Sequence, residues 1–472
     1  MKRLHSLIGL GFLTSSAKGF VIQENKAVRT KEELSAFTTS TTSSSQFPYK
    51  EDALDARAYT VPSQRTTASN AWDSFVLPVL GASFLITGNT VGAGCLVMPE
   101  LTAEPGLVAS SGIFAAAYIV NLVSGLLLAQ VAIHQRETSA EDVPASFQEF
   151  AEANLKNPLA ANGIAAISIF VNGLIQSFDI SRAGVLGVDY FGVPAGTASC
   201  LWASLAAVVV GTQSTKNVSQ VSSVCVTLLF ATFAAIVIPG MAAVSDPMGT
   251  LTASTTSPDN VMSAAMEAAP VILIAMIYQN IVPTVVKLLD YDRAKVTAAL
   301  ITGSFIPLVM YLCWCYTSLG GGIQGDLAEL LLSAFSVFAI AGSTLGTSLS
   351  LSEEIKNFVP GKRKDNSPES NNMIAAGLSL GVPLSAALAF SSGSGFTEAL
   401  NLAGSFGSPL LYGIIPVAMV WKQQQDQAAD SSSATKIPSM VPDAALPVLG
   451  SLSVGLVGEE LFQRFNEVAT FV

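Results

Sequence analysis

Long runs of apolar residues recur along this chain from residue 74 almost to its C-terminus, and they restrict the possible folds more than any other feature. A helix of about 20 apolar residues, rising 1.5 Å per residue, crosses the roughly 30 Å of hydrocarbon in a bilayer. Half of the 472 residues are hydrophobic and only 12% are charged, unlike a soluble domain. We therefore expect an all-α membrane protein with about eleven spans, whose transmembrane domain occupies residues 72–472. The predicted spans are residues 74–101, 107–133, 163–191, 196–212, 218–244, 261–289, 294–319, 327–351, 373–391, 395–421 and 445–458, and the last is short for a crossing.

The positive charges between these spans favour one orientation. Short loops that face the cytoplasm are enriched in lysine and arginine. With the N-terminus placed inside, the predicted outward loops contain no lysine or arginine. This asymmetry supports the order of crossings from the first span to the tenth. The cations of the inward loops are Arg136, Lys156, Lys216, Lys287, Arg293, Lys295, Lys356, Lys362, Arg363, Lys364, Lys422 and Lys436.

The N-terminal part has a different composition. Residues 1–20 place two cations before an apolar stretch of about ten residues, as a secretory signal does. Residues 21–71 are rich in serine and threonine and cannot bury a core, so we expect a disordered segment. Together they resemble the bipartite plastid presequence of algae with secondary plastids, which would place the protein in a plastid envelope. The alternative, favoured by Glu24, Glu32 and Glu33, is a cytosolic tail on a protein of the plasma membrane or endomembranes.

Composition and motifs argue against several function classes. The net charge is −11 and no basic stripe is present, so we expect no nucleic-acid partner. The only histidines are His5 and His134, and the five cysteines fall in apolar spans, so we expect no metal site. The sequence GLSLG at 377–381 fits a hydrolase motif but lies in an apolar span with no histidine after it. We therefore expect no enzyme activity and no cofactor.

A glycine-rich sequence, GNTVGAG at residues 88–94, interrupts the first span near its centre. Each glycine costs about 1 kcal/mol relative to alanine inside a helix, so the segment favours local unwinding. In hydrocarbon, freed peptide groups are tolerated only where they line a cavity or meet a ligand. Close helix packing at Gly88 and Gly92 is the alternative interpretation. The candidate binding residues here are Gly88, Asn89, Thr90, Gly92, Ala93 and Gly94.

The sixth span has a second polar interruption at matching depth, IYQNIVPT at residues 277–284, with the helix-breaking Pro283. A repeat that begins at the first span and one that begins at the sixth run in opposite senses through the membrane. Two discontinuous helices related in this way indicate a transporter with inverted repeats. Freed N–H groups suit a carboxylate and freed carbonyl groups suit an ammonium, so an amino acid fits both. The candidates are Ile277, Tyr278, Gln279 and Asn280.

Two groups of polar residues are candidates for coupling or gating. Asp179 and Arg182 lie inside the third span, where a charge costs on the order of 3 kcal/mol. Their i, i+3 spacing allows a structural ion pair, and the alternative makes Asp179 a proton carrier or a gate. Ser343 and Thr344 in the eighth span can offer hydroxyls to a sodium ion, or bond back to their own helix.

The sequence GNTVGAGCLVMPELTAEPG at residues 88–106 resembles the first span of the tyrosine/tryptophan permease family, in the amino acid/polyamine/organocation superfamily. Residues 269–320, 335–351 and 400–421 are similar to later spans of that family. The resemblance implies a LeuT-like 5+5 inverted repeat plus one extra helix, and ion-coupled transport of aromatic amino acids by alternating access, with protons as the expected coupling ion. The family commonly has a small residue and a histidine where this chain has Ile277 and Gln279. A sodium-coupled carrier, a broader neutral amino acid carrier and a channel are therefore the alternatives, and the expected partners are an amino acid and membrane lipid.

Overall fold

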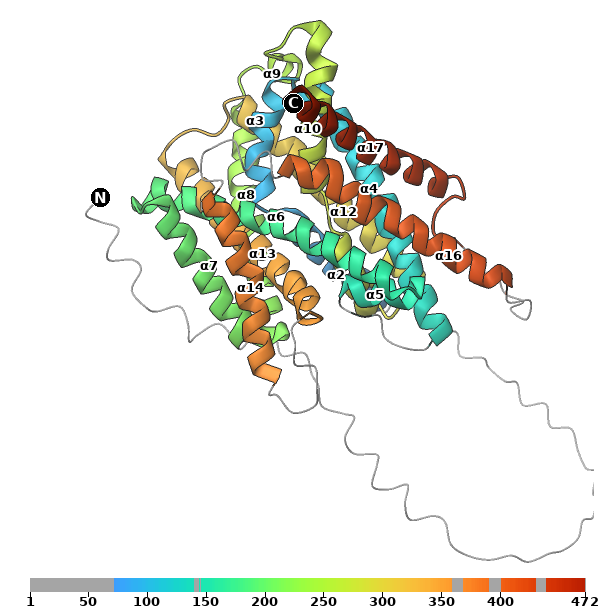
Figure 1. Ribbon diagram of the computed structural model, residues 1–472. Helices are drawn as coiled ribbons and strands as arrows, with labels where there is room; N and C mark the ends of the chain where they lie inside the picture. The colour runs from blue at the N-terminus through green and yellow to red at the C-terminus, as the bar shows by residue number, and fades with distance from the viewer. Residues whose placement is uncertain are drawn as a thin grey trace, which may run out of the picture. The chain divides into compact units, whose positions relative to one another are not determined.

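The computed structural model describes residues 72–139, 144, 146–358, 368–389, 400–429 and 439–471, and every element in these ranges is helical (Figure 1). Among the described residues, ten helices are long and apolar enough to cross a membrane, or eleven if one bent pair counts as a span. The prediction of an all-α, multi-span membrane protein is therefore confirmed. The presequence and the Ser/Thr-rich segment predicted at 1–20 and 21–71 lie outside the described residues.

Most spans are single helices that begin at an N-cap or a proline. Asp292, for example, accepts hydrogen bonds from the N–H groups of Ala294 and Lys295 and so starts α12. The tenth span, Leu400–Ala428, is built from η5 (Ala403–Gly407), η6 (Pro409–Ile414) and α16 (Ile415–Ala429). The uninterrupted helices are α4 (Leu107–Ser139), α6 (Pro158–Phe191), α7 (Ala195–Thr212), α8 (Thr215–Ala243), α12 (Arg293–Leu319), α13 (Asp326–Lys356), α14 (Pro368–Ala389) and α17 (Ala445–Phe471).

Two spans lose their helical winding, as predicted. The first begins with η1 (Trp72–Val76) and α2 (Leu77–Thr90), breaks at residues 91–92 and resumes as η2 (Ala93–Val97) and α3 (Met98–Ala103), with a bend of 56°. The other contains α10 (Val261–Ala275), a break at residues 276–278, η4 (Gln279–Ile281) and α11 (Val282–Leu288). We call these the first break (residues 91–92) and the second break (residues 276–278). α2 packs against α12, α10 packs against α4, and α13 lies beside α6 and α8.

Three short helices were not predicted, and several helices are longer than the predicted spans, the last one most of all. The amphipathic helix α5 (Phe147–Leu155) joins α4 to α6, and α9 (Pro247–Thr252) and η3 (Pro258–Asn260) lie before α10. The predicted end of the last span at residue 458 is wrong, because α17 continues to Phe471. A hydropathy pattern marks only the apolar part of a helix, whereas Arg464 and Glu460 extend this one with an i, i+4 ion pair of 2.5 Å.

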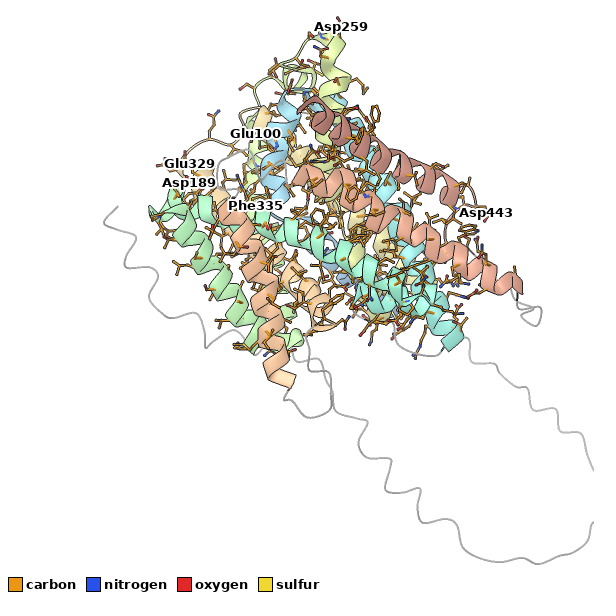
Figure 2. All side chains as sticks on the ribbon, in the orientation of Figure 1. Glu100, Asp189, Asp259, Glu329, Phe335 and Asp443 are labelled. Atoms are coloured by element: carbon orange, nitrogen blue, oxygen red, sulfur yellow. The ribbon has the colours of Figure 1, made fainter. Side chains whose placement is uncertain are left out.

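Contacts among charged side chains bring several helix ends together. Arg293 at the start of α12 pairs with Glu137 at the end of α4 (3.4 Å), and Lys156 after α5 pairs with Asp426 of α16 (2.9 Å). We call this end of the bundle, where Lys156, Arg293, Lys295 and Lys422 lie, the basic end. Figure 2 labels five acidic side chains, Glu100, Asp189, Asp259, Glu329 and Asp443. Which end faces the cytoplasm stays a prediction.

Candidate functional site

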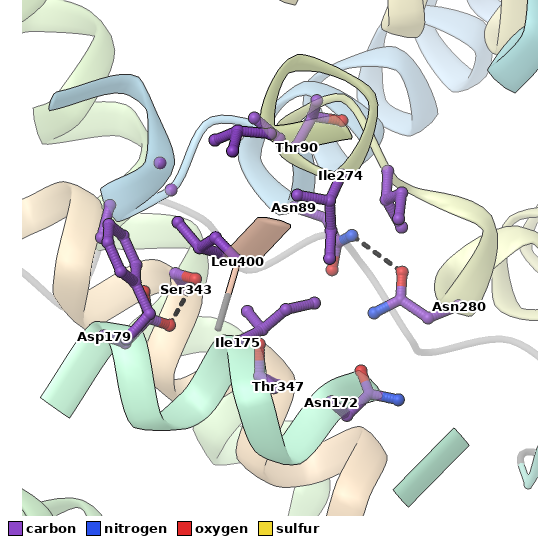
Figure 3. Close-up of a pocket in the computed structure, with 17 residues that line it drawn as sticks. Asn89, Thr90, Asn172, Ile175, Asp179, Ile274, Asn280, Ser343, Thr347 and Leu400 are labelled. Carbon is purple, nitrogen blue, oxygen red and sulfur yellow. Dashed lines mark hydrogen bonds between the residues drawn. The ribbon is translucent and has the colours of Figure 1, made fainter. Parts of the chain in front are cut away.

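The two breaks face one cavity, together with α6, α13 and the start of the tenth span (Figure 3). The cavity has a volume of about 650 Å³, part of which is open to solvent. The lining residues are Asn89, Thr90, Gly92, Ala93, Gly94, Asn172, Ile175, Phe178, Asp179, Val271, Ile274, Ala275, Ile277, Asn280, Ser343, Thr347 and Leu400.

The first break depends on a close approach between Gly92 and α13. A Cβ atom on Gly92 would lie 2.8 Å from both Cβ and Oγ of Ser343, closer than side chains tolerate. On the other side of the break, a helix begins at Ala93, and the first N–H groups of any helix lack intrahelical acceptors. The break thus presents peptide N–H groups at the positive end of a helix dipole beside the cavity.

Two side-chain contacts connect the breaks. Asn89 Nδ2 donates a hydrogen bond of 2.9 Å to Asn280 Oδ1. The buried Tyr311 hydroxyl, on α12, lies 3.0 Å from the carbonyl oxygen of Thr90 and 2.9 Å from that of Ala275. These carbonyls end α2 and α10, where helices leave oxygens unsatisfied, so one hydroxyl serves both breaks. Sequence reasoning missed Tyr311, because a tyrosine in an apolar span has no local signal for this contact.

Tyr278 and Gln279 were predicted to bind substrate, but they lie outside the cavity and contact Asn121 of α4. Gln279 Nε2 donates to Asn121 Oδ1 (2.6 Å), and the Tyr278 hydroxyl donates to the Asn121 carbonyl (3.2 Å). Asn121 Nδ2 in turn donates to the Leu273 carbonyl (3.2 Å). Tyr278 and Gln279 are fully buried. The side chains of Tyr278 and Gln279 turn toward α4 because Asn121 on that helix offers hydrogen-bond partners to the non-helical segment. Sequence reasoning also missed Asn121.

Asp179 lines the cavity and is 1% exposed. The Ser343 hydroxyl of α13 donates a hydrogen bond of 2.6 Å to its Oδ2 (Figure 3). The predicted ion pair between Asp179 and Arg182 is wrong: these two described residues form no salt bridge, and Nε of Arg182 is buried without a hydrogen-bond partner. The i, i+3 spacing permits a pair but does not enforce one, and Ser343 supplies the nearer contact.

Three further predicted site residues lie outside the cavity. Gly88 remains within α2, where an added Cβ would lie 2.5 Å from Val226 of α8, so close packing explains this glycine. The Thr344 hydroxyl accepts a hydrogen bond of 3.1 Å from Trp202 Nε1. Arg182 is absent from the cavity wall. Among the residues that the structure describes, no group of histidine, cysteine and acidic side chains could hold a metal ion.

Comparison with known proteins identifies the family. Residues 77–329 and 315–436 match the family model of the tryptophan/tyrosine permeases, and this region includes both breaks and the whole cavity wall. The chain belongs to this family. The family prediction is confirmed, and the permease is a transport protein rather than an enzyme.

Individual relatives agree with this assignment. The permease is 25% identical over 392 residues to tyrosine-specific transport system 1 of Haemophilus influenzae, an alignment that covers 74% of this chain and 89% of the relative. It is 24% identical over 270 residues to tyrosine-specific transport system 2 of the same organism (53% and 60% covered). It is 25% identical over 309 residues to the tryptophan-specific transport protein of Pseudomonas aeruginosa (58% and 70% covered).

Proposed function

We propose that the permease is a secondary active transporter for aromatic amino acids, tyrosine or tryptophan, and that these bind between the two breaks. One observation carries the proposal: peptide groups of two interrupted spans face a single cavity that is apolar on another side. The apolar wall consists of side chains from α6, from α10 and from the start of the tenth span. It includes Ile175, Phe178, Ile274 and Leu400, which suit an aromatic ring.

The polar wall can hold the charged end of the substrate. The N–H groups of Ala93 and Gly94 begin a helix and suit the carboxylate. The carboxylate of Asp179, whose Oδ2 already accepts from Ser343, leaves its second oxygen for the ammonium group or a proton. The names of the relatives, which specify tyrosine or tryptophan, support an aromatic side chain.

Proton coupling is the ion coupling that the cavity supports best, with Asp179 as the proton carrier. A carboxyl group beside the substrate can take up a proton before transport and release it afterwards. A sodium-coupled mechanism would require hydroxyls of α13 to be turned toward the first break. Of the two predicted hydroxyls, Ser343 lies at the first break and donates to Asp179, whereas Thr344 bonds to Trp202 of α7, so only one of them is in place for a sodium ion.

We further propose that the spans form a LeuT-like 5+5 inverted repeat plus one extra helix, and that the site opens alternately to each side. The support is that the first and sixth predicted spans are the interrupted ones and that their breaks meet through Asn89 and Asn280. Such an arrangement is typical of carriers with inverted repeats.

The test is a competition panel of amino acids in proteoliposomes, with proton and sodium gradients imposed separately. We expect saturable accumulation driven by the proton gradient, with tyrosine or tryptophan as the strongest competitors. Flux that does not saturate would indicate a channel instead. Equal competition by all neutral amino acids would reject the aromatic preference.

The subcellular location of the permease is a separate proposal. Residues 1–71 resemble a plastid presequence, and we propose the plastid envelope of an alga as the location. A fluorescent protein fused behind these residues tests this. Fluorescence in the plastid envelope is expected, whereas fluorescence at the plasma membrane or endomembranes would reject the proposal.

A further inference from the structure

A line of buried polar residues follows the contact between α6 and α13 from the cavity to the basic end. At one end, Ser343 bonds to Asp179 (2.6 Å). At the other, the Ser168 hydroxyl interacts with the carboxylate of Glu354, near the end of α13. The same number of residues separates Ser168 from Asp179 as separates Ser343 from Glu354, so the two helices run antiparallel in register. A helical rise of 1.5 Å per residue places the two carboxylates ~16 Å apart.

The residues between these ends are polar, and some have no protein partner. Asn172 and Thr347 form part of the cavity wall, and Asn172 Nδ2 lies 3.3 Å from the Ser168 hydroxyl. Gln176 and Ser348 are fully buried, yet neither amide atom of Gln176 nor the Ser348 hydroxyl has a hydrogen-bond partner. Buried polar groups of this kind hold ordered water in proteins, and water with hydroxyls can conduct a proton. We call these residues the polar seam.

The carboxylate of Glu354 binds the N-terminus of helix α5. Its Oε1 accepts a hydrogen bond from the N–H of Phe147 (2.5 Å), and its Oε2 accepts one from the N–H of Gln148 (3.3 Å). The Ser146 hydroxyl caps the same helix and accepts from Asn357 Nδ2 (2.9 Å). Glu354 is 2% exposed, so its charge depends on these donors and on the positive end of the α5 dipole.

Helix α5 also contacts the spans on either side. Asn154 donates to Gln135 of α4 (3.0 Å) and accepts from Gln423 of α16 (2.9 Å). Lys156, directly after α5, pairs with Asp426 of α16 (2.9 Å). Through these contacts α5 joins α4, α13 and α16 at the basic end, so its release from α13 would loosen that end of the bundle.

We propose that Glu354 is a second proton site of the permease, connected to Asp179 by the polar seam, and that its protonation releases α5 and opens the basic end. The inference rests on the proposed proton coupling. Asp179 loses its proton along the seam, Glu354 gains one, and the proton then leaves Glu354 to the solution at the basic end. A protonated carboxyl is a weaker acceptor and carries no charge for the positive end of the α5 dipole, so the hydrogen bonds from Phe147 and Gln148 weaken.

The charges around Glu354 suit a group that changes its protonation state. Glu149 of α5 acts on it electrostatically. Glu149 disfavours the charged form, whereas the two N–H donors of α5 favour it. On α13 itself, Glu353 and Lys356 form their own ion pair of 2.7 Å, and none of the lysines that the structure describes pairs with Glu354.

The test measures tryptophan and proton flux in proteoliposomes that contain a pH-sensitive dye. Accumulation driven by a pH gradient is compared with tryptophan counterflow at equal pH on both sides. We expect Glu354→Gln to lose accumulation and tryptophan-driven acidification by about tenfold or more, with a much smaller loss of counterflow. The matched control is Glu353→Gln, which removes a partly exposed carboxylate one position away and should retain both activities.

A second variant keeps the inference testable if Glu354→Gln misfolds. Gln176→Leu combined with Ser348→Ala interrupts the polar seam without touching α5. This double variant should likewise lose accumulation while it keeps most of its counterflow. Ser336→Ala, which removes a hydroxyl bonded back to Leu332 on the same helix, is its control. Equal losses of accumulation and counterflow in Glu354→Gln, or full coupling in the seam variant, would overturn the inference. Failure of the wild type to accumulate tryptophan in a pH gradient would reject the proton coupling on which it rests.

Discussion

The two breaks open onto the same cavity, but different interactions hold them. At the first break, Gly92 approaches Ser343 so closely that no side chain fits, so the segment depends on the absence of a Cβ atom at this position. At the second break, Gln279 and Tyr278 bond to Asn121, so polar side chains replace the missing helical bonds. We therefore expect the first break to be disrupted by a larger side chain at Gly92, and the second break to be disrupted by loss of its hydrogen bonds to Asn121. This difference explains why glycines mark one interruption and polar residues the other.

The largest effect is expected from Gly92→Val. Overpacking costs roughly 1–3 kcal/mol, and the cavity wall itself has to move, so we expect tryptophan uptake at background with normal insertion. Uptake in proteoliposomes, with surface labelling for insertion, measures this. Gly81→Val is the control on α2, because nothing lies within 4 Å of a Cβ added there. Normal uptake by Gly92→Val would mean that close packing does not define the first break.

Asn121→Leu tests the second break and ranks next. The substitution removes the 2.6 Å side-chain partner of the fully buried Gln279 Nε2 and leaves it only the Asn121 carbonyl at 3.3 Å, which costs about 1–3 kcal/mol, or roughly 5- to 150-fold in transport efficiency. Competition assays measure the loss. A double-mutant cycle with Gln279→Ala and Asn121→Ala provides the control, since residues in one network do not act additively. Additive losses would show that the two side chains act separately.

Tyr311→Phe removes the hydroxyl that both breaks share and keeps the ring, which packs against Phe114. Because a single hydrogen bond contributes about 1 kcal/mol, we expect a loss of about fivefold in kcat/KM for tryptophan uptake. Tyr316→Phe on the same helix, whose hydroxyl makes no hydrogen bond within the described residues, should behave as wild type. Equal behaviour of the two variants would remove Tyr311 from the site.

The smallest effect is expected from the direct contact between the breaks. Asn89→Ala loses one partly buried hydrogen bond to Asn280, which contributes about 0.5–1 kcal/mol, or two- to fivefold in apparent affinity. Asn280→Ala should match it, and the double variant should be no worse than either single variant. A much larger loss from Asn89→Ala alone would indicate that this side chain contacts the substrate itself.

Much of the fold could be predicted from the sequence, because bilayer thickness imposes a length on every apolar run. The two breaks were also predictable, since glycines and a proline inside apolar spans are a local signal. The end of α17 was not, because its last turns are polar, and helix α5 was missed because it is too short and too polar to resemble a span.

The candidate site was predicted only in part. Gly92, Ala93 and Asn280 lie at the cavity as expected, but Gly88 and Gln279 do not, because a break in a helix does not show which way each side chain turns. Tyr311, Asn121 and Glu354 act through contacts between distant spans. Sequence spacing within one helix contains no information about such partners.

The central claim is that the two breaks together bind the amino acid. A cryo-electron microscopy structure of the purified permease with tryptophan tests it most directly. We expect ligand density between the breaks, with the carboxylate at the N–H groups of Ala93 and Gly94 and the ring against Phe178 and Ile274. Tryptophan bound elsewhere, or a first span wound continuously through Val91 and Gly92, would contradict the account.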